Sequence, residues 1–285
     1  MSEFIIENGV LEKYNGSDEA TVRIPEGVTR IGWQAFCGCD KLRKVVIPES
    51  VTEIEREAFK GCSALTKIVM PRGVTCIGAD AFVKTKFYET DRNWKKGILY
   101  IGKYLIAAGS RSDGTVKKGT EIIADYAFMS RIFIERIALP EGIRIIGARA
   151  FCGCTALREA VIPQGVTEIG EGAFWCCSSL VEVTVPESTV SVGANAFYSC
   201  TSLRKCELTE GVTEIGEDAF RGCSALTEAV IPSSVKRIPP RAFCWCKSLS
   251  SVTVSDGVTE IGEEAFKGCE SLREIVIPES VSGIE

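Results

Sequence analysis

Residues 212–232 read VTEIGEDAFRGCSALTEAVIP, and versions of this stretch recur every 23 residues along almost the whole chain. A fixed period of this length predicts a solenoid, in which each repeat buries its apolar face by stacking on its neighbours. From Pro25 to Pro278 is eleven periods, which gives twelve coils. All ten Ala-Phe dipeptides share one register, with their phenylalanines at Phe36, Phe59, Phe82, Phe128, Phe151, Phe174, Phe197, Phe220, Phe243 and Phe266.

Each repeat contains two short extended stretches. Ala229 and Ile231 alternate with Val230, which predicts a strand with one face inward. Pro232 then ends the strand, because proline cannot donate to a ladder of hydrogen bonds. The β-branched stretch V-T-x-I forms a second extended segment, and the glycine after it allows a tight bend. The A-F-x-x-C segment that follows is long enough only for a short helical turn.

The columns of Leu, Phe, Cys and Val-Ile resemble the BspA-like class of leucine-rich repeat, and the resemblance runs from the start of the chain to its last residues. It implies an α/β solenoid, a curved right-handed leucine-rich-repeat array with a parallel β-sheet on its inner face and the short helical turns on its outer side. Members of this class are mostly bacterial surface or host-contact proteins without enzymatic activity. The resemblance therefore implies a non-catalytic scaffold.

The organisation predicted is a single leucine-rich-repeat domain over residues 1–285. The opening segment Phe4 to Tyr14 resembles that of the same class, and its Asn8-Gly9 pair between two alternating runs predicts a β-hairpin. We interpret this hairpin as an N-terminal cap. The cap covers 1–19, regular repeats cover 20–82, irregular repeats with a projecting hairpin cover 83–127, and regular repeats with an incomplete last copy cover 128–285.

Composition excludes several classes of function. The net charge of -5 argues against generic binding to nucleic acid, and no apolar run approaches the roughly 18 to 20 residues that span a membrane. The start of the chain lacks the features of a signal peptide, so the chain as written is expected in the cytoplasm. Removal of a leader would change that expectation to the cell surface or secretion.

Histidine is absent, which removes the commonest general base and metal ligand. The carboxylates recur at variable positions of the repeat, and no catalytic triad, phosphate loop or cofactor motif is present. We therefore predict no enzymatic activity and no cofactor.

Fourteen cysteines form the most unusual part of the composition. Eight of them lie three residues after the phenylalanine, and a column of buried, reduced thiols is the favoured interpretation because free cysteine is among the most buried residue types. One local cluster leaves a zinc site or thiol chemistry open as an alternative, although the usual spacing of zinc ligands is missing. The cluster consists of Cys152, Cys154, Cys176 and Cys177.

The outward positions of the longer strand are the main candidates for partner binding. One column changes from basic to acidic along the chain, and the other is mostly apolar although it faces water. Strand propensity alone also favours β-branched residues there, so a binding groove and a plain strand surface remain alternatives. The candidates are Lys44, Val46, Lys67, Val69, Arg136, Glu159, Val161, Glu182, Thr184, Lys205, Glu207, Glu228 and Val230.

Trp175 and Tyr198 form a second candidate, because they follow the phenylalanine on neighbouring coils. In the simpler interpretation, both side chains pack at the edge of the core. An exposed pair would instead mark a contact site, since such residues often anchor interfaces.

The leading functional hypothesis is a scaffold that binds another protein or a surface polymer along its sheet. The alternative is a structural spacer within a longer surface protein. The chain also stops inside a repeat, at Glu285, which predicts either truncation of a longer natural protein or end-to-end pairing through the C-terminal strand edge. The expected state in solution is accordingly a monomer or an end-to-end dimer.

Overall fold

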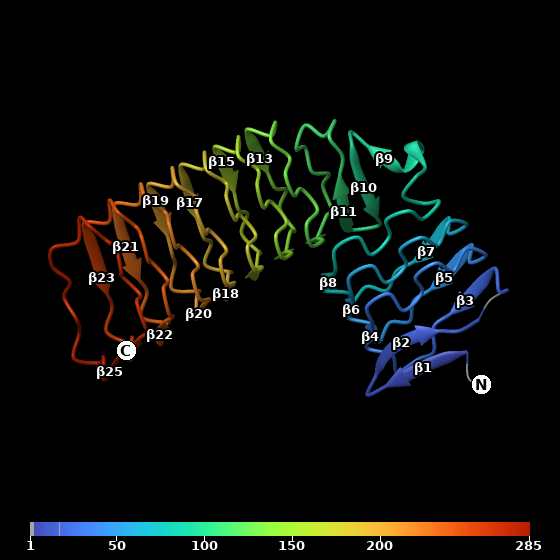
Figure 1. Cartoon of the computed structure of the whole chain (residues 1–285), viewed down its shortest axis with the longest axis horizontal. Coiled ribbons are helices and arrows are strands. Elements are labelled where there is room, and N and C mark those ends of the chain that lie inside the picture. The colour runs from blue at the N-terminus through green and yellow to red at the C-terminus, as the bar shows by residue number, and fades with distance from the viewer. Residues whose placement is uncertain (1–2, 17) are drawn as a thin grey trace. The chain divides into compact units, whose positions relative to one another are not determined.

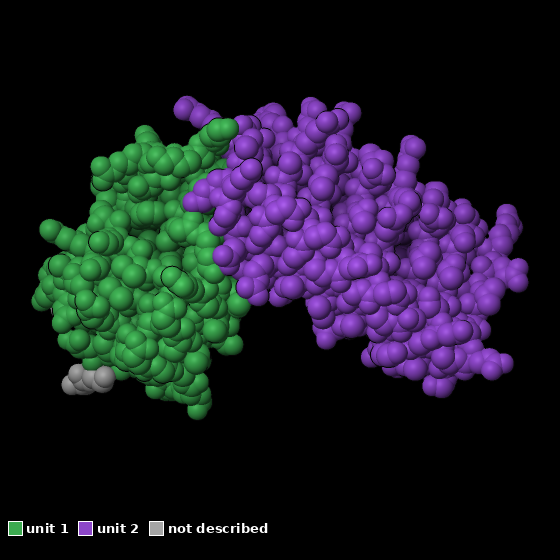
Figure 2. Space-filling view, turned by 180° about the vertical axis from the view of Figure 1, so that it is seen from behind, with its two compact units in different colours: residues 1–107 green, residues 108–285 purple. Residues whose placement is uncertain are grey.

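The computed structural model describes residues 3–16 and 18–285, and its contacts divide the chain into two compact units, Met1–Ala107 and Ala108–Glu285 (Figure 2). Each unit is a stack of parallel coils (Figure 1). The fold is a β-solenoid, as the 23-residue period predicts. The expectation of a single domain over the whole chain stays a prediction. Residues 1, 2 and 17 of the predicted N-terminal cap lie outside the described residues, so their part in the cap also stays a prediction.

Most regular coils contribute one longer and one shorter strand, and most of these strands pair in parallel with their counterparts 23 residues away. In unit 1 the longer strands are β3 (Thr21–Arg23), β5 (Lys44–Val46) and β7 (Lys67–Val69), and the shorter ones are β4 (Arg30–Ile31), β6 (Glu53–Ile54) and β8 (Cys76–Ile77).

Unit 2 repeats this arrangement. Its longer strands are β13 (Arg136–Ala138), β15 (Glu159–Val161), β17 (Glu182–Thr184), β19 (Lys205–Glu207), β21 (Glu228–Ile231) and β23 (Ser251–Val254). Its shorter strands are β12 (Ile122–Ile123), β14 (Ile145–Ile146), β16 (Glu168–Ile169), β18 (Ser191–Val192), β20 (Glu214–Ile215), β22 (Arg237–Ile238), β24 (Glu260–Ile261) and β25 (Gly283–Ile284).

The predicted N-terminal hairpin is present. Strands β1 (Phe4–Glu7) and β2 (Val10–Tyr14) pair antiparallel around Asn8 and Gly9, which both have positive φ. Strand β2 then pairs in parallel with β4 of the first coil. The Tyr14 ring stacks on Phe36 at a centroid distance of 5.0 Å, so the hairpin closes the aromatic stack of the coils.

The irregular segment over residues 83–127 differs from the projecting hairpin that its sequence predicts. It holds a 3-10 helix, η1 (Asp91–Asn93), and the strands β9 (Trp94–Lys95), β10 (Ile98–Ile101) and β11 (Tyr104–Ala108). Ile98, Leu99 and Leu105 are fully buried. The run is therefore part of the core, because its apolar side chains replace the missing columns of the regular repeat.

The phenylalanines form the centre of both units. Within each unit their rings stack in one line, and neighbours such as Phe174 and Phe197 lie 5.3 Å apart with planes inclined by 2°. Phe36, Phe59 and Phe82 form the line in unit 1, and the seven from Phe128 to Phe266 form the line in unit 2. Close aromatic contacts of this kind add to the gain from burying apolar area.

The predicted short helical turns are wrong: the described residues contain no α-helix. In the first regular coil, Gln34 and Gly38, two residues before and after Phe36, have positive φ, which an α-helix does not accommodate. Along this turn, successive backbone N–H groups donate alternately to a carbonyl of the same turn and to a carbonyl of the next coil. Cys37 N–H donates to Gln34 within the turn, whereas Phe36 N–H donates to the carbonyl of Ala58 on the next coil at 2.8 Å. Bonds between coils therefore take the place of a helical ladder.

Candidate interaction surface

The outward residues of the longer strands, here called the strand face of each unit, are the surface that the sequence predicts for binding. In unit 2 all of the predicted strand residues are exposed: Arg136, Glu159, Val161, Glu182, Thr184, Lys205, Glu207, Glu228 and Val230. Their alternation with buried residues such as Ile137 and Val183 follows from the two-residue period of a strand.

The longer strands of unit 2 lie side by side (Figure 1), and their parallel register aligns these side chains in two rows. Arg136 lies opposite Glu159, and Glu159 lies opposite Glu182. The Arg136 guanidinium and the Glu159 carboxylate form an ion pair at 3.4 Å. In the second row Val161 is 55 % exposed and Val230 is 50 % exposed. The strand face of unit 2 therefore combines exposed apolar side chains with a mostly acidic row.

The strand face of unit 1 has the opposite charge. Lys44 lies opposite Lys67, and Val46 lies opposite Val69. Lys67 and Val69 are exposed, whereas Lys44 and Val46 are half-buried. Within the described residues neither lysine forms an ion pair. Two like charges side by side on a sheet are destabilising, so this row would gain from an anionic partner.

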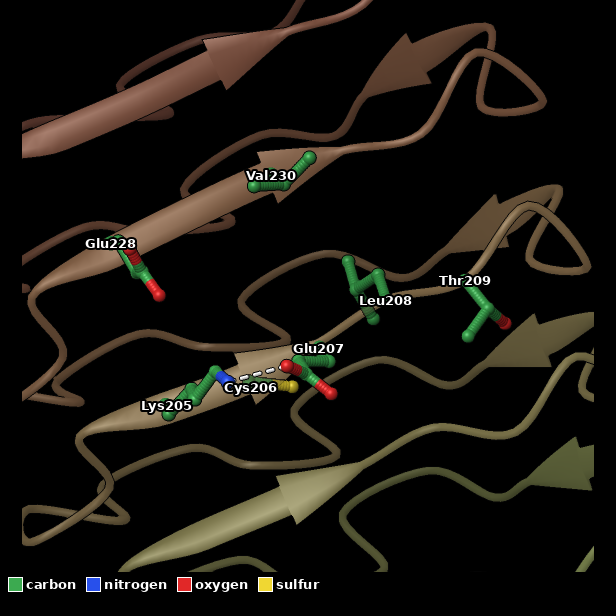
Figure 3. A pocket seen from close by; sticks show the side chains of 7 residues that line it. All are labelled: Lys205, Cys206, Glu207, Leu208, Thr209, Glu228 and Val230. Carbon is green, nitrogen blue, oxygen red and sulfur yellow. Dashed lines mark ion pairs between the residues drawn. The ribbon is translucent and has the colours of Figure 1, made fainter.

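A pocket interrupts the strand face of unit 2 between β19 and β21 (Figure 3). It has a volume of about 390 Å³ and is lined by Lys205, Cys206, Glu207, Leu208, Thr209, Glu228 and Val230. Four of these residues are among the candidates, but the cavity itself is not predicted by the sequence. The available signal was Thr209, which stands where neighbouring repeats have Pro186 and Pro232.

The predicted aromatic pair lies on the turns rather than on the strand face. The Trp175 and Tyr198 rings are 5.1 Å apart, and both residues are half-buried. The Arg149 guanidinium lies 5.0 Å from the Trp175 ring centre, and that of Arg221 lies 5.8 Å from the Tyr198 ring centre. Cation–π contacts of this kind stabilise the turn edge without a partner. A role of the pair in binding stays a prediction.

The cysteines of the phenylalanine-plus-three column are free thiols, and each from Cys62 onward donates its S–H to a phenylalanine carbonyl 26 residues earlier. The Cys177 Sγ, for example, lies 3.2 Å from the Phe151 oxygen. Burial raises the pKa of Cys177 and Cys200 well above the ordinary thiol value. These thiols are therefore structural hydrogen-bond donors at neutral pH.

The proposed thiol cluster contains two kinds of side chain. Cys154 and Cys177 are buried and donate to carbonyls, while Cys152 and Cys176 are half-buried. In the described part of the chain, no three or more Cys, Asp or Glu side chains gather in a way that could hold a metal ion.

A further surface feature was not predicted. Met129, Ile132 and Phe133 are exposed on one turn of unit 2, and the Phe133 side chain is 82 % exposed. Arg131 and Ile134 replace the usual Cys and Leu of this repeat, which is the signal that the sequence offered.

The repeats match a family model described as the BspA type leucine rich repeat region, in six copies over residues 12–113, 121–249 and 236–285. The chain belongs to this family. The resemblance predicted from the Leu, Phe, Cys and Val-Ile columns is thereby confirmed. The BspA-type repeats account for nearly all of both units.

Solved structures support the same fold. A leucine-rich repeat protein from Bacteroides ovatus is 24 % identical, with a TM-score of 0.55, over 95 % of this chain and 91 % of its own. One from Eubacterium ventriosum is 21 % identical, with a TM-score of 0.61, over 96 % and 91 %. A leucine rich cell surface protein from Faecalibacterium prausnitzii is 23 % identical over 99 % and 92 %, but its TM-score is only 0.33.

No curated protein is significantly similar to the chain. Among the described residues, no helix is long and apolar enough to cross a membrane.

Proposed function

We propose that this BspA-type repeat protein is a non-catalytic scaffold that binds another protein or a surface polymer along its strand faces. The observation that carries the proposal is the exposure of Val161 and Val230 in strands whose neighbouring outward positions are charged. Specific interfaces combine apolar contact area with charged groups that fix orientation. A surface location, which the family resemblance implies, stays a prediction.

The charge of the two strand faces supports a partner with charges of its own. Lys44 and Lys67 adjoin each other in unit 1, and Glu159 and Glu182 adjoin each other in unit 2. Each such pair costs stability in the free protein. A bound partner with opposite charges at these points would offset that cost and would favour one orientation.

Strand propensity is the competing explanation of the exposed valines, and it leaves a structural spacer as the second function. The two functions differ in one respect. A binding face is sensitive to a charge placed among its apolar residues, whereas a spacer tolerates the same charge as long as it folds.

The test compares the immobilised full-length chain with Val161→Glu and with Val230→Glu for the proteins retained from a cell-surface extract, identified by mass spectrometry. Val190→Glu is the matched control, because Val190 is 48 % exposed but lies beside the shorter strand β18. We expect the strand-face variants to lose proteins that the wild type and Val190→Glu retain. Identical sets of retained proteins for all four chains would support the spacer and overturn the proposal.

A further inference from the structure

The ladder of longer strands is broken between β19 and β21. Strand β19 pairs with β17, and β21 pairs with β23, but β19 and β21 are not paired. On the preceding coil, Val185 N–H donates to the Glu207 carbonyl at 3.0 Å. The corresponding bond from Leu208 N–H to the Val230 carbonyl is absent from the described part of the chain. The break therefore coincides with the pocket.

The break coincides with three departures from the repeat. Thr209 occupies the proline position, and Cys206 and Leu208 occupy the two inward positions of the strand. Cys206 and Leu208 are half-buried, whereas Val183 and Val185, their counterparts on the preceding coil, are buried. The inward side chains of this coil are thus less deeply packed, and the pocket exposes part of them.

The charges of the pocket do not cancel. The Lys205 ammonium and the Glu207 carboxylate form an ion pair at 2.5 Å, drawn as the dashed line in Figure 3. Glu228 comes from the neighbouring strand and forms no ion pair within the described residues. Burial raises the pKa of the Cys206 thiol, so this side chain is neutral at neutral pH. Lys205 also interacts electrostatically with Glu228, and one lysine against two glutamates leaves the pocket with a net negative charge.

Apart from Thr209, the remaining wall of the pocket is apolar. Val230, Leu208 and Cys206 line it beside the Glu228 carboxylate. A long cationic side chain suits this combination, because its aliphatic stem packs on apolar surface while its charged head reaches a carboxylate. A volume of about 390 Å³ is large enough for one such side chain.

We propose that the pocket between β19 and β21 binds a cationic group on an aliphatic stem, the lysine or arginine side chain of a partner protein, with Glu228 as its counter-ion. This inference deepens the proposed function and rests on it for the identity of the partner. The pocket anchors one basic residue, and the exposed Val230 at its rim contacts the partner chain around that residue.

The test uses agmatine, which carries a guanidinium at one end of a four-carbon stem and an ammonium at the other, and butanoate, an anion with a comparable stem. Titration of the full-length protein is followed by NMR of the Val230 and Leu208 methyl groups. We expect saturable shifts with agmatine and none with butanoate. Glu228→Gln is expected to weaken agmatine binding at least tenfold, while Glu274→Gln, an exposed residue of the same row outside the pocket, leaves it unchanged.

Absence of saturable shifts with agmatine would overturn the proposal, as would equal binding by Glu228→Gln. Binding of butanoate in preference to agmatine would identify Lys205 as the functional charge and would also overturn it. These results are independent of the retention experiment with Val161→Glu, because Val161 lies outside the pocket. The two experiments therefore distinguish a pocket that does not bind a cationic group from a strand face that does not bind a partner.

Discussion

The Cys223 Sγ donates a hydrogen bond to the backbone carbonyl of Phe197, which lies 3.1 Å away on the preceding coil. The same carbonyl accepts the N–H of Cys200 within its own turn, also at 3.1 Å. Each thiol of the column thus uses the second acceptor site of a carbonyl that already closes a turn. Cysteine suits this position because it is a small apolar side chain that fills the space, and its single weak donor pairs with the free acceptor site of the carbonyl.

Replacing Cys223 by alanine should lower the free energy of unfolding by about 1 to 2 kcal/mol, because it removes a buried hydrogen bond and leaves a small void. Urea denaturation followed by circular dichroism measures the change. Cys37→Ala is the control, since Cys37 is exposed and should tolerate the substitution. Equal stability of the two variants would show that the thiol column contributes nothing specific.

Replacing Phe197 by alanine should cost about 3 to 5 kcal/mol, because Phe197 is fully buried between two stacked rings. Phe133→Ala should leave the thermal midpoint nearly unchanged, since that ring already lies in solvent. Differential scanning calorimetry of both variants tests the pair. A comparable loss in both would contradict the stacked core described above.

Alkaline pH should destabilise the protein. Burial raises the pKa of Cys154 and of Cys269 to about 11 from the ordinary thiol value of 9.0. Their stabilising effect is fully present below pH 9, where both folded and unfolded thiols are protonated. As pH rises from 9 to 11, the unfolded chain loses protons that the folded chain retains, so the free energy of unfolding falls.

Denaturation in urea at a series of pH values from 8 to 11 measures this effect. The variant Cys154→Ala supplies the control, because it should be less stable at pH 8 but should lose less on going to pH 11. A flat profile, or the same slope in both chains, would contradict the role of the buried thiols.

At turn positions with positive φ, glycine should be tolerated and a β-branched residue should lower stability. Asp80, two residues before Phe82, has a φ of 57°. Asp80→Gly should be neutral or slightly stabilising, while Asp80→Val should cost about 1 to 2 kcal/mol, because a β-branched residue is strained in this region. Thermal denaturation of the two variants tests the difference. A tolerated valine would show that the turn can adopt another conformation.

The sequence predicted the stacking well because stacking depends only on spacing. A strict 23-residue period places each Phe next to the next Phe, and it also places Lys44 beside Lys67 and Glu159 beside Glu182. The strand faces could therefore be named from the sequence alone. The hairpin cap was predictable for a similar reason, because Asn8-Gly9 is a local turn signal.

The turns and the pocket were decided by the tertiary structure. The A-F-x-x-C segment is locally compatible with a helical turn, but the acceptor of Phe36 N–H is Ala58, 22 residues later, and bonds to the next coil replaced the helix. Similarly, the period of the repeat continues through Cys206, Leu208 and Thr209, and only the packed coils show that the ladder opens there. The period determines which residues lie side by side, whereas packing and hydrogen bonding between coils determine the conformation in which they do so.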